Sequence, residues 1–150
     1  MHKGRYGEVI DKSGEYWTGD SAEDINEYLC CFAGNNDLEI KTVRCSCGCD
    51  IFEATLDTFE KVIKVKCDKC GAEKFLLDSE DYWEEAKPEV AVCPICNSKK
   101  YNFRIGFIRR NTGEVMWVYM GNRCTKCNVL GSYMDFGINY GPTTEMEKNI

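Results

Sequence analysis

Four close groups of cysteines, an internal repeat and alternating apolar and polar residues together predict a small, metal-stabilised, mainly β protein. The chain has 150 residues, of which 43% are hydrophobic and 11 are cysteines. We expect two tandem units, each a β-hairpin or three-stranded sheet closed by cysteines, with one N-terminal amphipathic helix. Units of this size have too small an apolar core to fold without a metal.

The cysteines are expected to be metal ligands rather than halves of disulfides. The sequence has no apolar run of membrane-spanning length, and residues 1–12 lack the apolar core of a secretory signal. We therefore expect a cytoplasmic protein without a membrane partner. Because cytoplasmic thiols are kept reduced, closely spaced cysteines in such a protein indicate metal binding.

The spacing of the cysteines predicts two sites. A first group, CSCGC at residues 45–49, is followed by C-x-x-C pairs at 67–70, 93–96 and 124–127. One pair places two thiolates on a tight turn, and a hairpin that returns a second pair completes a tetrahedron around Zn²⁺. This is the zinc-ribbon pattern, so we expect two tandem zinc ribbons and two structural zinc ions. The predicted ligands are Cys45, Cys47, Cys67 and Cys70 in one site, and Cys93, Cys96, Cys124 and Cys127 in the other.

The first group holds three cysteines where a ribbon needs two. An aromatic residue follows Cys47 by five positions, as another follows the second cysteine of CPIC. Cys47 therefore corresponds to that second cysteine, Cys45 to the first with one residue deleted, and Cys49 to a serine. Cys45 and Cys47 still converge, because strand residues i and i+2 point to one side. A site in which Cys49 replaces Cys47 or Cys45, with Gly48 turning the chain, stays open.

One amphipathic helix is expected in the stretch GDSAEDINEYLCCFAG. Ser21 and Asp24 have the spacing of a capping box, and Gly34 is suited to end the helix in a left-handed conformation. The apolar stripe of Ile25, Tyr28, Leu29 and Phe32 is expected to be core and to pack on the first ribbon. Cys30 and Cys31 fall outside the repeat, and we expect packing rather than redox roles for them.

These elements predict a division of the chain into five segments. The linker is acidic and locally helical until Pro88, and the tail is polar and expected to fray. The segments are an N-terminal hairpin and helix (1–42), zinc ribbon 1 (43–78), an acidic linker (79–92), zinc ribbon 2 (93–142) and a tail (143–150).

The net charge of −6 is unevenly distributed, with −6 in residues 1–40, −4 in 41–92 and +4 in 93–150. Acidic surfaces attract basic partners, so we expect an interaction module, for instance an inhibitor or immunity-type protein, that binds a basic protein. The sequence does not indicate an oligomeric state. The candidate partner-binding residues are Glu23, Asp24, Glu27, Tyr16 and Trp17.

The alternative is a nucleic-acid-binding or transcription-associated ribbon that uses the basic, aromatic C-terminal unit. Cations there contact phosphates while exposed aromatic rings stack on bases. The acidic remainder of the chain opposes a polyanion, so this reading ranks second. Its candidate residues are Arg104, Arg109, Arg110 and Trp117.

Catalysis is not expected. His2 is the only histidine, and the sequence has no glycine-rich phosphate loop. Four thiolates per metal also leave no position for water or substrate.

The eight paired cysteines, with CPIC…CTKC the clearest case, resemble those of zinc-ribbon proteins, and the second unit resembles ribbons of transcription factors and RNA polymerase subunits. The resemblance covers residues 43–140 and implies zinc and the ribbon fold. Ribbons of the elongation-factor type act through an acidic pair at the hairpin tip. Here the tip reads RRNTGE, so that activity is not implied. The whole layout, YWTG…DINEYL before two ribbons and INYGP after them, resembles small bacterial double zinc-ribbon proteins, which implies a bacterial origin but no mechanism.

Overall fold

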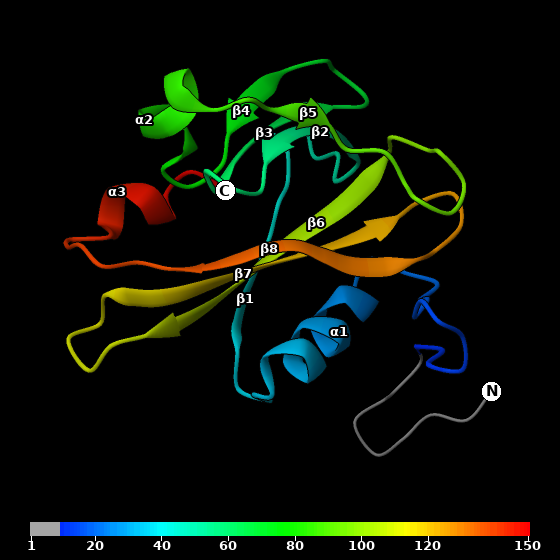
Figure 1. Ribbon diagram of the computed structural model, residues 1–150, viewed down its shortest axis with the longest axis horizontal. Helices are drawn as coiled ribbons and strands as arrows, with labels where there is room; N and C mark the ends of the chain where they lie inside the picture. Colours follow the sequence, from blue (N-terminus) through cyan, green and yellow to red (C-terminus); the bar gives the residue numbers. More distant parts are fainter. Residues whose placement is uncertain (1–9) are drawn as a thin grey trace.

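The computed structural model describes residues 10–150 and shows one mainly antiparallel β-sheet with a few short helices (Figure 1). The main path of the sheet has the order β4-β3-β2-β6-β7-β8, while β1 pairs with β6 and β5 pairs with β2. No helix in residues 10–150 is long and apolar enough to cross a membrane.

The helices and strands have the following bounds in chain order: α1 (Asp24–Ala33), β1 (Glu39–Thr42), β2 (Phe52–Asp57), β3 (Val62–Cys67), β4 (Glu73–Phe75), α2 (Ser79–Tyr82), the 3-10 helix η1 (Trp83–Glu85), β5 (Glu89–Val90), β6 (Tyr101–Arg109), β7 (Val115–Cys124), β8 (Leu130–Gly137) and α3 (Thr144–Glu147).

The sheet contains two equivalent three-stranded units, β2–β4 and β6–β8. In the first unit Phe52 pairs with Cys67, and in the second Tyr101 pairs with Cys124. The two units meet where Phe52 of β2 pairs with Tyr101 of β6. The two aromatic residues that the repeat aligns thus occupy equivalent positions and join the units, and both are almost fully buried.

Helix α1 ends as its sequence predicts but begins later than a cap at Ser21 would give, with Glu23 at the N-cap position and no side-chain capping hydrogen bond. The backbone amide of Ser21 donates to the Asp24 carboxylate at 3.1 Å, which is one half of the expected capping box. Gly34 follows the last turn with φ 65° and ψ 31°, and its left-handed conformation suits glycine because it has no Cβ.

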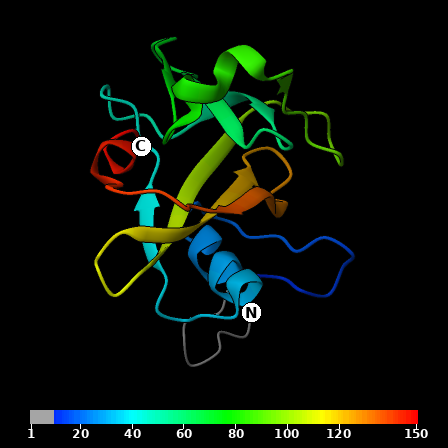
Figure 2. The same cartoon turned by 60° about the vertical axis from the view of Figure 1, so that its left-hand side comes forward.

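The helix packs on the second unit, so the expectation that it packs on the first was wrong. Ile25 and Leu29 of α1 are fully buried and lie against β7. Gly121 of β7 permits this approach, because a Cβ there would lie 2.5 Å from Ile25. Figure 2 shows α1 beneath the long β6–β8 sheet, with the first unit above it. β1 also pairs with β6, so residues 39–42 lie in the sheet of the second unit.

The N-terminal hairpin is described only in part. Asp11 and Thr18 form an isolated antiparallel bridge, and the Asp11 carboxylate accepts the Ser13 amide at 2.9 Å. The bridge is consistent with the expected N-terminal hairpin. Most of the expected first strand, together with His2, lies outside the described residues.

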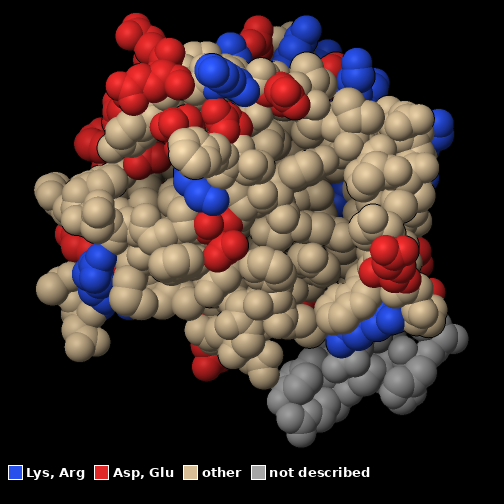
Figure 3. All heavy atoms as spheres, viewed as in Figure 1, with Lys and Arg blue, Asp and Glu red and all other residues tan. Residues whose placement is uncertain are grey.

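The linker is locally helical, as predicted, through α2 and η1, which end before Pro88. Figure 3 shows acidic side chains gathered at the upper left, over the position of α2 in Figure 1. The exposed acidic residues of this segment, here called the linker surface, are Glu80, Asp81, Glu84 and Glu85.

The C-terminal tail is ordered and packed, so the expectation that it frays was wrong. Thr143 is fully buried and its hydroxyl accepts the Val115 amide at 3.1 Å, while Met146 is 4% exposed. Asn149 exchanges two hydrogen bonds with the backbone of Leu77, of 2.7 and 2.9 Å. Long-range partners therefore hold a segment whose own composition is polar.

An arginine clamps the tail to the sheet. The Arg109 guanidinium donates two hydrogen bonds of 2.9 Å to Glu39 of β1 and bonds of 2.7 and 3.2 Å to Glu147 of α3. These bonds hold the pKa of both carboxyl groups below the ordinary value.

We predict that Glu147→Gln lowers the free energy of unfolding by about 1 to 2 kcal/mol, because it removes a charge-assisted pair from a partly buried site. Glu145→Gln is the matched control: the Glu145 side chain is 88% exposed, and its ion pair within residues 10–150 is with Lys148, three positions away. Loss of this exposed ion pair should change the free energy of unfolding by less than about 0.5 kcal/mol. Denaturant titrations of the three proteins test this, and equal stabilities would contradict the clamp.

Candidate metal centres and the adjacent aromatic surface

The first cluster gathers the sulfurs of Cys45, Cys47, Cys67 and Cys70. The Cys45 and Cys70 sulfurs lie 3.4 Å apart, the Cys47 and Cys67 sulfurs 3.6 Å apart, and all four lie within 4.8 Å of one another. The turn before β2 supplies two of the sulfurs, and the turn between β3 and β4 supplies the others.

The second cluster repeats this arrangement with Cys93, Cys96, Cys124 and Cys127. The Cys93 and Cys127 sulfurs and the Cys96 and Cys124 sulfurs are each 3.5 Å apart, again with all four within 4.8 Å. The structure therefore brings together the same two sets of cysteines that the repeat predicts.

Both clusters fit a tetrahedral thiolate-bound metal. Four sulfurs placed 2.3 Å from a central Zn²⁺ are separated by about 3.8 Å, close to the spacings found here. Cysteine-only donor sets favour soft or borderline metals such as zinc over Mg²⁺ or Ca²⁺. The molecule thus has two cysteine-only clusters that are consistent with two zinc ions.

Each cluster is built from two tight turns that end in a left-handed residue. These positions are Gly48 and Gly71 in the first cluster (φ 94° and 78°) and Asn97 and Asn128 in the second (φ 64° and 70°). Glycine and asparagine tolerate this conformation better than other residues, so the sequence around each cysteine pair favours the turn that the site needs.

Cys49 lies outside the first cluster, in the place of Ser98. The Cys45 amide donates to the Cys49 carbonyl at 2.9 Å, as the Cys93 amide donates to the Ser98 carbonyl at 2.8 Å. The Cys49 sulfur accepts the backbone amide two residues later, at 3.4 Å, and the Ser98 hydroxyl does the same at 3.3 Å. The geometry supports the repeat alignment over a site that includes Cys49.

Hydrogen bonds and neighbouring sulfurs lower the pKa of some thiols in each cluster and raise the pKa of others. The amide of Cys70, with that of Lys69, lowers the pKa of Cys67 to about 6 against the effect of burial. Although the amide of Cys49 lowers the pKa of Cys47, burial and the neighbouring sulfurs raise it to about 12. One thiol therefore ionises readily, and its negative charge opposes the ionisation of the next thiol. A divalent cation removes this repulsion, so four thiolates and a metal ion stabilise one another.

The second cluster shows the same division. Burial raises the pKa of Cys124, but the amides of Cys127 and Lys126 and the nearby sulfurs outweigh burial and lower it to about 7. Burial and the other sulfurs raise the pKa of Cys127 to about 12.

The N-terminal segment is attached to the second cluster. The Gly19 amide donates to the Asn128 carbonyl at 2.9 Å, and the Leu130 amide donates to the Trp17 carbonyl at 2.8 Å. Arg123, which precedes a cysteine of the cluster, donates to the Gly19 carbonyl at 2.7 Å and to the Asn128 side chain at 2.6 Å. The turn that carries two sulfurs of the second cluster thus also positions residues 17–19.

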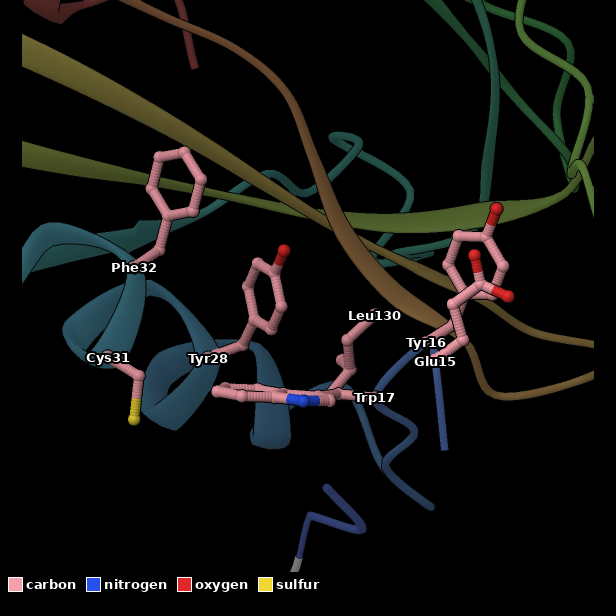
Figure 4. A pocket seen from close by; sticks show the side chains of 7 residues that line it. All are labelled: Glu15, Tyr16, Trp17, Tyr28, Cys31, Phe32 and Leu130. Atoms are coloured by element: carbon pink, nitrogen blue, oxygen red, sulfur yellow. The ribbon is translucent and has the colours of Figure 1, made fainter. Parts of the chain in front are cut away.

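An aromatic hollow of about 260 Å³ lies beside this segment (Figure 4). Tyr16 is 47% exposed and Phe32 is 49% exposed, whereas Trp17 and Tyr28 are half-buried. Figure 4 shows the rings of Trp17, Tyr28 and Phe32 close together beside α1, with Tyr16 and Glu15 on the other side of Leu130. The residues that line the hollow are Glu15, Tyr16, Trp17, Tyr28, Cys31, Phe32 and Leu130.

The sequence predicted only part of this hollow. Tyr16 and Trp17 were expected at a partner surface, but Tyr28 and Phe32 were expected in the core with Ile25. The two aromatic residues lie four positions apart and therefore share one face of α1, which was the available signal. Of the two cysteines outside the repeat, Cys30 is half-buried and Cys31 is exposed in the wall of the hollow.

The acidic residues predicted for this surface have different environments. Glu23 is exposed and Glu27 is partly buried, with its carboxylate 3.8 Å from the Lys12 ammonium. Asp24 is only 6% exposed and accepts the Ser21 amide. Asp24 therefore stabilises its own helix and is not available to a partner.

Candidate nucleic-acid residues of the second unit are engaged inside the molecule. Arg104 donates to the Asn26 side chain of α1 at 3.0 Å, and Arg109 is held between two carboxylates. Arg110 is exposed but donates to the Ile138 carbonyl. Trp117 is 37% exposed and its indole N–H donates to Asp135 at 2.9 Å. Their positions do not form a continuous free cationic surface.

Comparisons of the chain with protein-family models, with curated proteins and with solved structures found no match. The candidate site therefore rests on its own geometry.

We predict that the folded protein carries two metal ions per chain and that both are zinc in protein purified without added metal. Native mass spectrometry tests the stoichiometry. A strong chelator should unfold both units, and the first site should lose its metal faster because Cys47 and Cys70 are exposed. One ion or none in carefully purified protein would contradict the prediction.

We predict that Cys49→Ser keeps two metal ions and nearly full stability, because serine supplies the same contact at the equivalent position of the second unit. Cys47→Ser should lose one metal ion and most of the order of the first unit. Metal content and thermal unfolding of both variants distinguish the two ligand sets. Loss of metal in Cys49→Ser alone would show that the ligand assignment is wrong.

Proposed function

We propose that the two clusters hold structural zinc ions, that each three-stranded unit is a zinc ribbon, and that the protein is a non-catalytic cytoplasmic module that binds a basic protein. An inhibitor or immunity-type role fits this proposal. The observation that carries it is the acidic, aromatic surface that the second cluster positions around Trp17.

The composition of the clusters supports a structural role for the metal. Four thiolates complete the tetrahedral coordination of zinc and leave no position for water or substrate. Zinc binding by such sets contributes on the order of 10 kcal/mol to folding in small ribbons. Two Zn(Cys)₄ groups also add negative charge, which makes the holoprotein more acidic than its sequence alone.

The surface around Trp17 supports a protein partner. Aromatic side chains that are partly exposed around a hollow are enriched where proteins bind one another, since they bury large areas at little cost in conformational entropy. Glu15, Asp20 and Glu23 are exposed around the same segment and favour a partner with a basic surface.

A nucleic-acid partner is the weaker alternative. Arg104 and Arg109 donate to partners within the chain, and an acidic protein repels phosphates. A gel-shift with RNA and single-stranded DNA at low salt tests this alternative directly.

We predict that the triple variant Glu15→Lys, Asp20→Lys, Glu23→Lys weakens binding of the partner at least about tenfold, mainly through a slower on-rate that loses its dependence on salt. The partner is first captured from a lysate of the native host with the wild-type protein, and surface plasmon resonance then measures the rates.

The matched control carries the same change of charge on the linker surface, as Glu80→Lys, Glu84→Lys, Glu85→Lys. It should bind nearly as the wild type does. Loss of binding in the control alone would move the partner site to α2. A gel-shift that depends on Arg110 would instead favour the nucleic-acid reading.

A further inference from the structure

We propose that the aromatic hollow is a docking site for one basic side chain, a lysine or arginine, of the partner protein. This inference rests on the proposed function and specifies which chemical group of the partner the surface recognises. Lysine and arginine share the chemistry that matters here, a cationic group at the end of a long apolar side chain.

The arrangement of the rings suits a cation. The Trp17 and Tyr28 rings meet edge to face with centroids 5.9 Å apart, and the Tyr28 and Phe32 rings are stacked at 6.2 Å. Figure 4 shows the Trp17 ring edge-on as a floor, with Tyr28 standing above it. Ring faces attract ammonium and guanidinium groups, and Trp does so most strongly.

The size of the hollow suits a single side chain. Its volume of about 260 Å³ is smaller than the roughly 300 to 1,000 Å³ typical of small-molecule sites. An extended lysine or arginine stem can lie against Leu130 and the rings while its charged end remains near the rim.

The carboxylate in the wall supplies the complementary charge. Glu15 lines the hollow, is exposed, and has no ion pair within residues 10–150. Within this part of the chain, no cation competes for its carboxylate through an ion pair.

The chain already places one ammonium group on this aromatic surface. Lys12 Nζ lies 5.1 Å from the centroid of the Trp17 ring, 3.8 Å from the Glu27 carboxylate and 3.7 Å from the Cys31 sulfur. This internal contact is of the same kind as the one proposed for the partner. Because the Lys12 ammonium repels a second cation nearby, removing its charge should strengthen the binding of a basic side chain.

The direct test uses three blocked tripeptides that differ only in the central residue: Gly-Lys-Gly, Gly-Arg-Gly and Gly-norleucine-Gly. Norleucine has an apolar stem of similar length to lysine but no charge. Titrations are followed by the indole N–H resonances of Trp17, Trp83 and Trp117 in the zinc-loaded protein. We expect the lysine and arginine peptides to shift the Trp17 resonance saturably, with dissociation constants on the order of 1 mM. The norleucine peptide should not.

Three variants make the test specific. Lys12→Met should tighten binding of the cationic peptides about two- to fivefold, because it removes the competing charge. Glu15→Gln should weaken it by a similar factor, and this surface change preserves the fold. Trp83→Leu is the matched control, because Trp83 also lies beneath a lysine, with Lys64 Nζ 5.2 Å from its ring, but far from the hollow in the chain. It should leave binding unchanged.

Several outcomes overturn the proposal: equal binding of the norleucine peptide, weaker binding by Lys12→Met, or a shift confined to Trp83 or Trp117. The proposed function fails separately. If no protein partner is captured but the cationic peptides bind at Trp17, the docking chemistry stands without that function. If a partner binds Glu15→Gln and Lys12→Met as it binds the wild type, the interaction stands but the docking site does not.

Discussion

The convergence of four cysteine sulfurs at each of two points is the constraint on which the rest of the structure depends. Sulfurs 3.4 to 3.6 Å apart cannot all ionise beside one another, and a divalent metal ion bound between them would turn this repulsion into a crosslink between distant turns. The register of both hairpins agrees with this crosslink, because a cysteine of each cluster pairs directly with the aromatic residue that begins the preceding strand. Metal binding and strand pairing therefore specify the same arrangement.

The second cluster has a further role, because its last turn carries the N-terminal segment. Arg123 is 9% exposed and donates to two backbone carbonyls of that segment, those of Gly19 and Asp20. Burying this guanidinium is tolerable only because its donors are satisfied. The position of Trp17 thus depends on the turn of a candidate metal site more than a hundred residues away in the chain, which connects the proposed structural metal to the proposed binding surface.

The two units form one sheet rather than independent modules. Phe52 and Tyr101 pair across the junction, β1 extends the second unit, and the Arg109 clamp ties the C-terminal helix to β1. The charge-assisted hydrogen bonds of Arg109 thus add to the pairing of β1 with β6 and to the burial of Met146 of the tail.

The sequence by itself determined the features that depend on neighbours close in the chain. The two sets of paired cysteines, the preference for Cys47 over Cys49, the left-handed end of α1 at Gly34 and the mainly β class all follow from spacing and turn chemistry. Only the tertiary structure decided that Cys49 lies outside the first cluster, which unit of the sheet α1 covers, that Asp24 is buried, that the tail is packed, and that Tyr28 and Phe32 border a hollow. These outcomes depend on contacts such as that of Gly121 with Ile25, between residues nearly a hundred positions apart. No periodicity or spacing records such a contact, because it is selected by the fit of two surfaces that exist only after the sheet has formed.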